Sequence, residues 1–395
     1  MSEIQPSSPP RKWFEIKNSM KTLSLNIENQ TMEQTATVES KSSWNQIYSL
    51  MALNAAIVIS WIAYHNYQPK VLQLFNFTEL SFFLVVAQGV ILVFIPVVAG
   101  WFGDYMIKKN GNYFIVTTVG ISVTAMVFMC VAFIVGSTNM VNLTAALPVM
   151  IVIWLISMNI FHSPANSMLD LFAPARRLPA AMAMMVLTTD LLYAFEPVVV
   201  DLVDWMGPVV TFAFGGVLLI VTGYIFRKTT QNVNFSRATE EAEAKESNFM
   251  TVVGTGLVFG LVYAVVKNYM AGWLMAKSDI DLPVQNEGIF VSIVLITAAI
   301  AAWPLSFQVD KIGLSKAVAI GLIGAAVSLG LVYILPMEYP ALVCALVAGV
   351  FLSLASVAAF PFALHNLSAK NITIGTGVFF GCFELAEGVI SIMQH

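Results

Sequence analysis

Gly100-Trp-Phe-Gly-Asp104-Tyr-Met-Ile-Lys108-Lys109 follows the second long apolar stretch of the chain, and Ser306-Phe-Gln-Val-Asp310-Lys311-Ile-Gly313 follows an equivalent stretch in the second half. Glycine allows neighbouring helices to approach closely, and an aspartate followed by cations at a membrane exit can pair charge across helices. A short segment with both features that occurs twice predicts an internal duplication. We therefore expect two related halves.

The composition places these motifs in a membrane protein. Hydrophobic residues make up 58% of the 395 residues and charged residues only 11%, with a mean hydropathy of +0.79. A bilayer core needs roughly 20 apolar residues per helix, and the chain contains many such stretches. We predict an all-α membrane protein. The net charge of -4 indicates no particular partner, and Cys130, Cys344 and Cys382 lie in apolar stretches that favour packing over disulfide or metal chemistry.

The apolar stretches predict eleven spans: 46–67, 79–102, 113–135, 143–163, 179–200, 208–226, 250–272, 287–307, 316–335, 341–362 and 372–393. The polar residues 1–43 lack the apolar core of a signal peptide and are expected to form a flexible cytoplasmic tail. We predict a six-helix bundle over 44–227, a cytoplasmic linker over 228–249 and a five-span bundle over 250–395. A six-plus-six duplication would then lack its last helix, through truncation of the coding sequence or through evolution.

The positive charges predict the orientation. With the amino terminus inside, all 19 Lys and Arg residues except Lys70, Lys267 and Lys277 fall on the cytoplasmic side, as the positive-inside rule requires. Lys267 lies within a span, and its long stem is expected to carry the ammonium to the outer interface.

The two halves and their duplicated motifs resemble the major facilitator superfamily across nearly all of residues 44–395. Two regions further resemble its sucrose/proton and glycoside-cation symporter branch. They are Asn159-Ile-Phe-His-Ser-Pro164-Ala-Asn166-Ser-Met-Leu-Asp170-Leu-Phe-Ala-Pro174, and Phe360-Pro361-Phe-Ala-Leu-His365 with Gly375-Thr-Gly377-Val-Phe-Phe-Gly381-Cys-Phe-Glu384. The resemblance implies two pseudo-symmetric six-helix bundles of the major facilitator type, with a solute site between them.

The same resemblance implies a gate at the cytoplasmic ends of the halves, formed by Gly100, Asp104, Lys108, Lys109, Asp310 and Lys311. Contacts of the aspartates with charges and helix ends would hold the outward-open state and break on switching. The alternative is topological: cations gather near the cytosol, and an acid balances them.

Departures from the branch limit what the resemblance implies. Asn166 stands where branch members carry arginine, and Glu384 replaces an asparagine. In the first motif, Tyr105 and Ile107 stand where the superfamily commonly has a basic residue and glycine. A sugar substrate is therefore implied by the branch alone.

Four acids within the predicted spans are candidate coupling-ion groups. Asp190 lies mid-span, Glu196 follows about 9 Å further outward on a different face, and Glu384 and Glu387 share one face of the last span. A desolvated carboxyl can bind a proton at neutral pH, and nearby hydroxyls and carbonyls could make it a sodium site. The alternative is a buried acid hydrogen-bonded to a neighbouring helix. We favour function for Asp190 and Glu384.

Several polar side chains are candidates for the substrate cavity: Tyr64, His65, Asn66, Gln68, Gln88, Asn159, His162 and Asn166. The group at the end of the first span offers the hydrogen bonds and the aromatic face that a sugar needs. An interfacial aromatic belt would equally explain the tyrosines, and a packed histidine would explain His162.

The sequence contains no phosphate-binding glycine loop, nucleophile-base-acid set or basic nucleic-acid patch. We expect no enzyme activity, cofactor, metal site or nucleic-acid partner. The predicted function is secondary active transport of a small polar solute, such as a sugar or glycoside, by alternating access coupled to a proton or sodium gradient. Its partners would be the solute, the ion and membrane lipid, in a bacterial inner membrane. A non-transporting receptor or scaffold descended from a transporter, or a passive facilitator, is the alternative.

Overall fold

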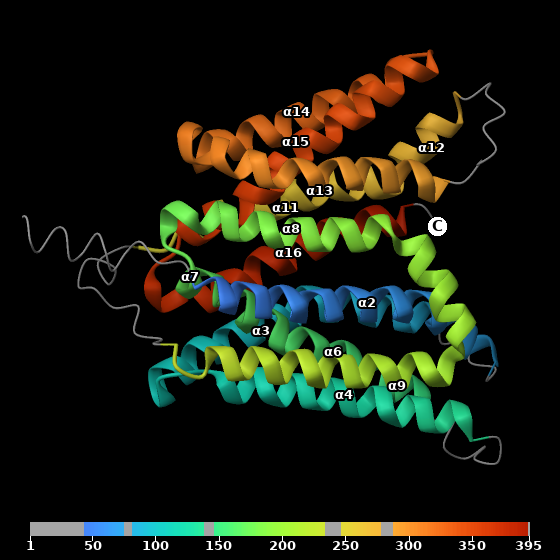
Figure 1. Ribbon diagram of the computed structural model, residues 1–395, viewed down its shortest axis with the longest axis vertical. Helices are drawn as coiled ribbons and strands as arrows, with labels where there is room; N and C mark the ends of the chain where they lie inside the picture. Colours follow the sequence, from blue (N-terminus) through green and yellow to red (C-terminus); the bar gives the residue numbers. More distant parts are fainter. Residues whose placement is uncertain (1–42, 75–80, 138–145, 234–245, 278–286, 394–395) are drawn as a thin grey trace, which may run out of the picture. The chain divides into compact units, whose positions relative to one another are not determined.

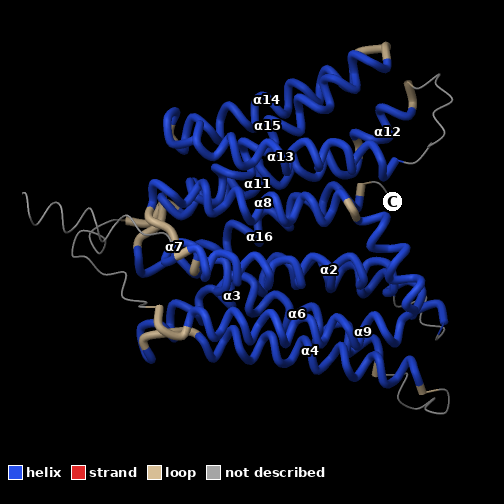
Figure 2. Tube along the Cα trace, in the orientation of Figure 1, coloured by secondary structure: helices blue, strands red, loops and turns tan. Residues whose placement is uncertain are grey.

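The computed structural model describes residues 43–74, 81–137, 146–233, 246–277 and 287–393. Figure 2 shows that these ranges are almost entirely helix joined by short turns, which confirms the predicted all-α class. The predicted tail lies outside the described residues apart from Ser43, and residues 234–245 of the predicted linker also lie outside them.

The helices fall into two sequence halves. The N-half contains α2 (Trp44–Leu74), α3 (Ser81–Asn110), α4 (Phe114–Gly136), α6 (Leu147–Ser167), α7 (Leu169–Phe172), α8 (Leu178–Ala194) and α9 (Glu196–Thr230). The C-half contains α11 (Phe249–Asn268), α12 (Met270–Met275), α13 (Glu287–Ile312), α14 (Leu314–Ile334), α15 (Glu338–His365) and α16 (Ile372–Ile392). The described residues of all eleven predicted spans fall on these helices, and the span 250–272 is interrupted at Tyr269 between α11 and α12.

Ten helices of the described ranges are long and apolar enough to cross a membrane. The predicted span 179–200 is divided, because α8 has 17 residues and α9 begins at Glu196, beyond a break at Phe195. Helix α9 extends for 35 residues and bends at Gly207, whose φ of +74° lies in the left-handed region that favours glycine. The chain is thus an integral multi-pass membrane protein.

The most extensive contacts between the halves are those of α3 with α16 and of α8 with α13, and α8 also contacts α15 while α6 contacts α16. In Figure 1, α13, α14 and α15 lie on one side of α8, and α2, α4 and α9 lie on the other. Close approach of α3 and α16 depends on glycine. A Cβ added at Gly377 would overlap the carbonyl oxygen of Pro96, and one at Gly381 would overlap that of Val93. Small residues of this kind let helix backbones pack directly in a membrane.

Equivalent backbone contacts occur in the two halves. The N–H of Ser43, just before α2, donates to the carbonyl of Phe172 at the end of α7 with a distance of 2.8 Å. In the C-half, the N–H of Asn248, just before α11, donates to the carbonyl of Asn366 after α15, also at 2.8 Å. The first helix of each half is therefore tied to the end of its fourth span, as expected for a duplicated unit.

Candidate functional site

The carboxylate of Asp104 caps the amino terminus of α16. Its Oδ2 accepts the N–H of Ile374 at 2.7 Å, and its Oδ1 accepts the N–H of Thr373 at 3.2 Å. The first turn of a helix has unpaired N–H groups and the positive end of the helix dipole, so both favour a carboxylate there. The aspartate of the first motif thus joins the two halves directly.

Thr373 makes further contacts with the N-half. Its carbonyl accepts the hydroxyl of Ser163 at 3.2 Å, and its own hydroxyl lies 3.4 Å from that of Ser167. A Cβ added at Gly100 would overlap the Thr373 carbonyl oxygen, so glycine is required beneath it. We call Gly100, Asp104, Ser163, Ser167 and Thr373 the Asp104 clamp, and the end of the protein where it lies the Asp104 end.

The second motif has a different arrangement. Asp310 in α13 is exposed. Lys108, Lys109 and Lys311 are exposed as well, and the Lys109 ammonium lies 5.9 Å from the centre of the Tyr105 ring. The gating role of these four side chains stays a prediction.

A cavity lies between the halves and contains about 1100 Å³ not filled by atoms, including the part open to solvent. Its walls come from α2, α6 and α8 of the N-half and from α11, α15 and α16 of the C-half. The polar residues that line it are Asn54, His162, Asn166, Thr189, Asp190, Tyr193, Tyr263, Lys267, Ser356, Glu384 and Glu387. Three of the predicted coupling acids (Asp190, Glu384 and Glu387) and two of the predicted substrate residues (His162 and Asn166) therefore line one cavity.

Asp190 is the most deeply buried acid of this cavity. Asp190 is 3% exposed, and its Oδ2 has no hydrogen-bond partner among the described residues. Its neighbour Thr189 instead accepts the side-chain amide of Asn54 at 2.7 Å, a bond that joins α8 to α2. A buried carboxyl oxygen without a partner is costly, and this differs from the alternative in which a neighbouring helix satisfies it.

Lys267 and Glu387 form an ion pair at the cavity wall. The ammonium lies 2.9 Å from Oε1 of Glu387 and 5.0 Å from the centre of the Tyr193 ring. The structure thus differs from the expectation that this lysine reaches the outer interface, because the carboxylate of α16 compensates its charge inside the protein. Glu384 lies one turn away on the same face of α16, within reach of both charges. Glu196 begins α9 and does not line the cavity.

The polar side chains at the end of the first span each contact a different partner. The Tyr64 hydroxyl donates to Gln88 at 3.2 Å, and the His65 ring stacks on Trp61 with centroids 5.5 Å apart. Asn66 donates to Asp204 of α9 at 2.9 Å. These bonds lie within the N-half, so they fix α2 in its bundle.

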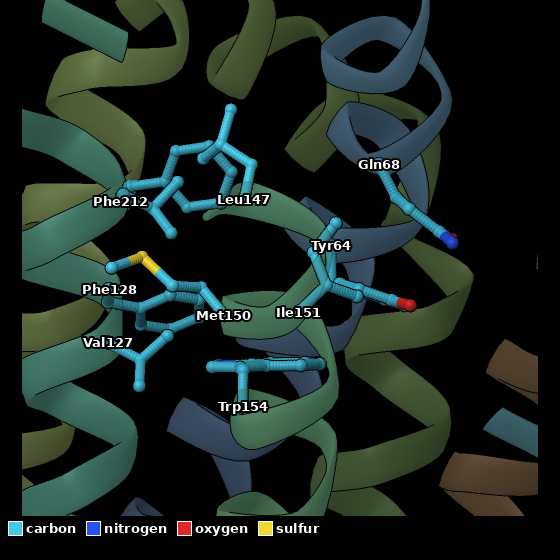
Figure 3. A pocket seen from close by; sticks show the side chains of 10 residues that line it. Tyr64, Gln68, Val127, Phe128, Leu147, Met150, Ile151, Trp154 and Phe212 are labelled. Atoms are coloured by element: carbon cyan, nitrogen blue, oxygen red, sulfur yellow. The ribbon is translucent and has the colours of Figure 1, made fainter. Parts of the chain in front are cut away.

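Tyr64 and Gln68 also border a separate, mainly apolar pocket among α2, α4, α6 and α9 (Figure 3). In that view, the Tyr64 hydroxyl and the Gln68 amide point away from Met150, Phe128 and the other apolar side chains. Asn159 is buried, and its amide donates to the Leu155 carbonyl of its own helix at 2.8 Å. Among the predicted substrate residues, His162 and Asn166 line the cavity between the halves.

The sequence analysis did not identify five polar residues of the cavity, Asn54, Thr189, Tyr193, Tyr263 and Ser356, nor the role of Lys267. Spacing could have indicated two of them, since Tyr193 lies three residues after Asp190 and Tyr263 lies four before Lys267 on a helix. Asn54 is an amide in the middle of an apolar stretch, which is itself a signal of a buried polar contact.

Comparison with known structures gives consistent matches. The chain aligns with the major facilitator superfamily transporter FucP in its outward conformation at 13% identity and a TM-score of 0.62, covering 88% of this chain and 90% of that one. A bacterial homologue of the iron transporter ferroportin, outward-facing with soaked iron, gives 15% identity, a TM-score of 0.63 and coverage of 88% and 90%. The human organic anion transporter MFSD10 (TETRAN) gives 11%, 0.62, 88% and 92%.

No model of a known protein family matches the sequence, and no curated protein matches it. At these identities the structural likeness establishes the fold. The chain is an all-α membrane protein with the major facilitator fold, which confirms the predicted fold class.

Proposed function

We propose that this protein is a secondary active transporter that carries a small solute through the cavity between its halves by alternating access. The observation that carries the proposal is a pairing of two features. The Asp104 clamp joins the halves at one end, while a large cavity lined by both halves contains the buried carboxyl of Asp190, whose Oδ2 has no hydrogen-bond partner among the described residues. The structural neighbours named above as transporters support transport as the general activity.

The contacts between the halves suit a reversible switch. Opening the clamp breaks the hydrogen bonds of Asp104 and Ser163 to the first turn of α16 and separates Gly100 from Thr373, all at one end of the protein. Rocking of two packed bundles about such an interface is a recognised mode of switching. We propose that the same motion closes the other end of the cavity.

We further propose that the carboxyls of Asp190 and Glu384 bind the coupling ion, a proton or sodium. Both line the cavity, and each comes from a different half. A carboxyl at such a site can change its charge when the cavity opens to water on the other side. Glu387, held by Lys267, and Glu196, outside the cavity lining, have less direct access to an ion.

The distribution of Lys and Arg supports a cytoplasmic position for the Asp104 end. With that orientation, the clamp closes the cytoplasmic side and the structure represents an outward-open state. A bacterial inner membrane fits this arrangement and remains part of the proposal.

A sugar or glycoside is one substrate class under this proposal. The branch resemblance supports it, and Asn166 and His162 of the resembling segment line the cavity. FucP, whose fold the chain shares, is a fucose:proton symporter of E. coli.

The test is uptake into proteoliposomes with imposed proton or sodium gradients, using labelled sugars, organic acids, peptides and amines. The proposal predicts saturable, gradient-driven accumulation of at least one solute class above its external concentration. Downhill flux without any accumulation would favour a passive facilitator. Absence of solute binding and of any change in cavity accessibility would favour a receptor or scaffold.

A further inference from the structure

The cavity between the halves carries more acid than base. Three carboxyls line it, those of Asp190, Glu384 and Glu387, while Lys267 is the one lysine and no arginine is present among the described lining residues. His162 packs its ring on Phe380 at 5.0 Å. Lys267 is paired with Glu387, which leaves Asp190 and Glu384 as the carboxyls that a positive ligand could meet, while no cationic side chain of the described lining is left for a negative one.

One ammonium group, that of Lys267, already lies at the cavity wall, and its contacts show how the cavity stabilises a cation. Lys267 places its Nζ against the Glu387 carboxylate at 2.9 Å and over the Tyr193 ring at 5.0 Å. A carboxylate on one side and an aromatic face on the other are the two contacts that stabilise a partly desolvated cation.

Asp190 offers the same two kinds of contact, and no cationic side chain of the described residues forms an ion pair with it. Its Oδ2 is buried and has no hydrogen-bond partner among the described residues. Tyr263, an aromatic residue of α11, lines the same cavity as Asp190.

Tyr263 belongs to a continuous aromatic wall, which we define as Phe259, Tyr263 and Phe383. Ring centroids are 6.2 Å apart for Phe259 and Tyr263, 5.5 Å for Tyr263 and Phe383, and 5.4 Å for Phe259 and Phe383. All three line the cavity. They present a surface for an apolar or aromatic body attached to a cation.

The side chains that could recognise other ligands are less available. The amide of Asn54 donates to Thr189 at 2.7 Å, and that of Asn166 donates to the His162 carbonyl at 3.1 Å, which leaves fewer donors for a sugar. Within the described residues, no group of three or more His, Cys, Asp or Glu side chains could hold a metal ion.

We propose that the substrate of this cavity is an organic cation, an amine or quaternary ammonium on an aromatic or apolar body, with Asp190 facing its positive charge and the aromatic wall contacting its body. This inference rests on the proposed function and narrows its substrate class. It reassigns Asp190 from the coupling ion to the substrate, so Glu384 is then the carboxyl that binds the coupling ion.

Three probes that share a benzyl group test the inference on the full chain in lipid nanodiscs. They are benzyltrimethylammonium (cationic), phenylmethanesulfonate (anionic) and benzyl β-glucoside (neutral sugar). Binding is measured by equilibrium dialysis with labelled probes, with subtraction of empty nanodiscs. We expect saturable binding of the ammonium, at least about tenfold tighter than either other probe, because a desolvated cation gains both contacts. Equal or tighter binding of the glucoside or the sulfonate would overturn the inference.

Two variants locate the site. Asp190→Asn should weaken ammonium binding by about tenfold or more, because it removes the charge and keeps the shape. Asp201→Asn makes the same change at an exposed carboxyl of α9 outside the cavity lining, and it should leave binding unaltered. Equal effects of the two variants would place the cation elsewhere. Size-exclusion profiles check that both variants are folded. If a variant does not fold, the comparison of the three probes on the wild-type protein still tests the inference.

The outcome separates this inference from the proposed function. If gradient-driven accumulation is found for a sugar while benzyltrimethylammonium does not bind, the substrate class is wrong and the transporter proposal holds. If the ammonium binds to Asp190 but no solute is moved, the transporter proposal is wrong and the ligand class holds.

Discussion

The carboxylate of Asp104 in α3 accepts the backbone N–H of Ile374 in α16 at 2.7 Å, across 270 positions of sequence. This bond and its partner at Thr373 attach the N-half to the first turn of a C-half helix. A single side chain thus contributes to holding one end of the protein closed.

Asp104→Asn should open the Asp104 end. The amide oxygen can replace one of the two accepted bonds, and the loss of charge at the helix terminus removes about 1–2 kcal/mol, a population shift of about tenfold. The measurement is the labelling rate of a single cysteine introduced at Leu169, a buried cavity-lining residue that is not part of the clamp, in a background without native cysteines. Asp310→Asn is the matched variant from the second motif, and it should have a smaller effect because that side chain is exposed. An unchanged rate in Asp104→Asn would contradict the clamp.

Gly377→Ala should weaken the contact between α3 and α16. Its added Cβ would overlap the Pro96 carbonyl oxygen, and overpacking of this kind costs about 1–3 kcal/mol. We expect a lower thermal unfolding temperature in detergent and faster labelling at the Asp104 end. Gly330→Ala in α14 is the control, because nothing lies within 4 Å of its added Cβ. Similar losses in both variants would mean that close packing at Gly377 is unimportant.

Lys267→Met should destabilise the protein by leaving Glu387 without its cation. The side chains are 33% and 20% exposed, so the cost is about 1–3 kcal/mol, below that of a fully buried pair. The double variant Lys267→Met/Glu387→Gln should recover much of the loss, because no charge then remains unpaired. Thermal unfolding of the two single variants and the double variant completes the cycle. Strict additivity would show that the pair contributes no coupling energy.

Asp190→Asn should raise the stability of the ligand-free protein by about 1 kcal/mol. Its Oδ2 has no hydrogen-bond partner among the described residues, and a neutral amide avoids the cost of placing a carboxylate there. Thermal unfolding checks the change, with Asp201→Asn as an exposed control expected to stay within about 0.5 kcal/mol of wild type. A clear loss of stability would show that the Asp190 carboxyl is structurally satisfied.

Glu384→Gln should abolish gradient-driven accumulation while some exchange of labelled for unlabelled solute remains. The amide cannot bind or release the coupling ion, but it leaves the cavity between the halves in place. Counterflow and gradient-driven uptake of the same solute separate the two processes. Full uphill uptake in this variant would remove Glu384 from the coupling mechanism.

The sequence could predict the features that depend on local composition. Apolar length and isolated acids can be recognised directly in the sequence. The described residues of the eleven predicted spans accordingly fall on helices, and the predicted acids Asp190, Glu384 and Glu387 line the cavity. The break at Phe195 was not anticipated, since the apolar stretch continues through it without a change in composition.

Partners on distant helices could not be predicted. The carboxylate of Asp104 binds backbone N–H groups, which have no signature in the sequence. The sequence alone predicts an interfacial position for Lys267, because its partner Glu387 lies 120 positions away and nothing near Lys267 in the chain indicates the pair. Packing of α11 against α16 brings the two side chains together. The polar residues at the end of the first span are predicted to form one substrate-binding group. In the structure, Tyr64 bonds to Gln88 of α3 and Asn66 bonds to Asp204 of α9, and neither partner is close in sequence.

Alternating access is tested most directly by spin-label distances at both ends of the same protein in lipid nanodiscs. One pair, at Lys109 and Lys316, reports the Asp104 end, and the other, at Trp205 and Tyr339, reports the opposite end; all four side chains are exposed. The account predicts that Asp104→Asn lengthens the first distance and shortens the second relative to wild type. Distances that stay fixed, or that change in the same direction at both ends, would contradict it.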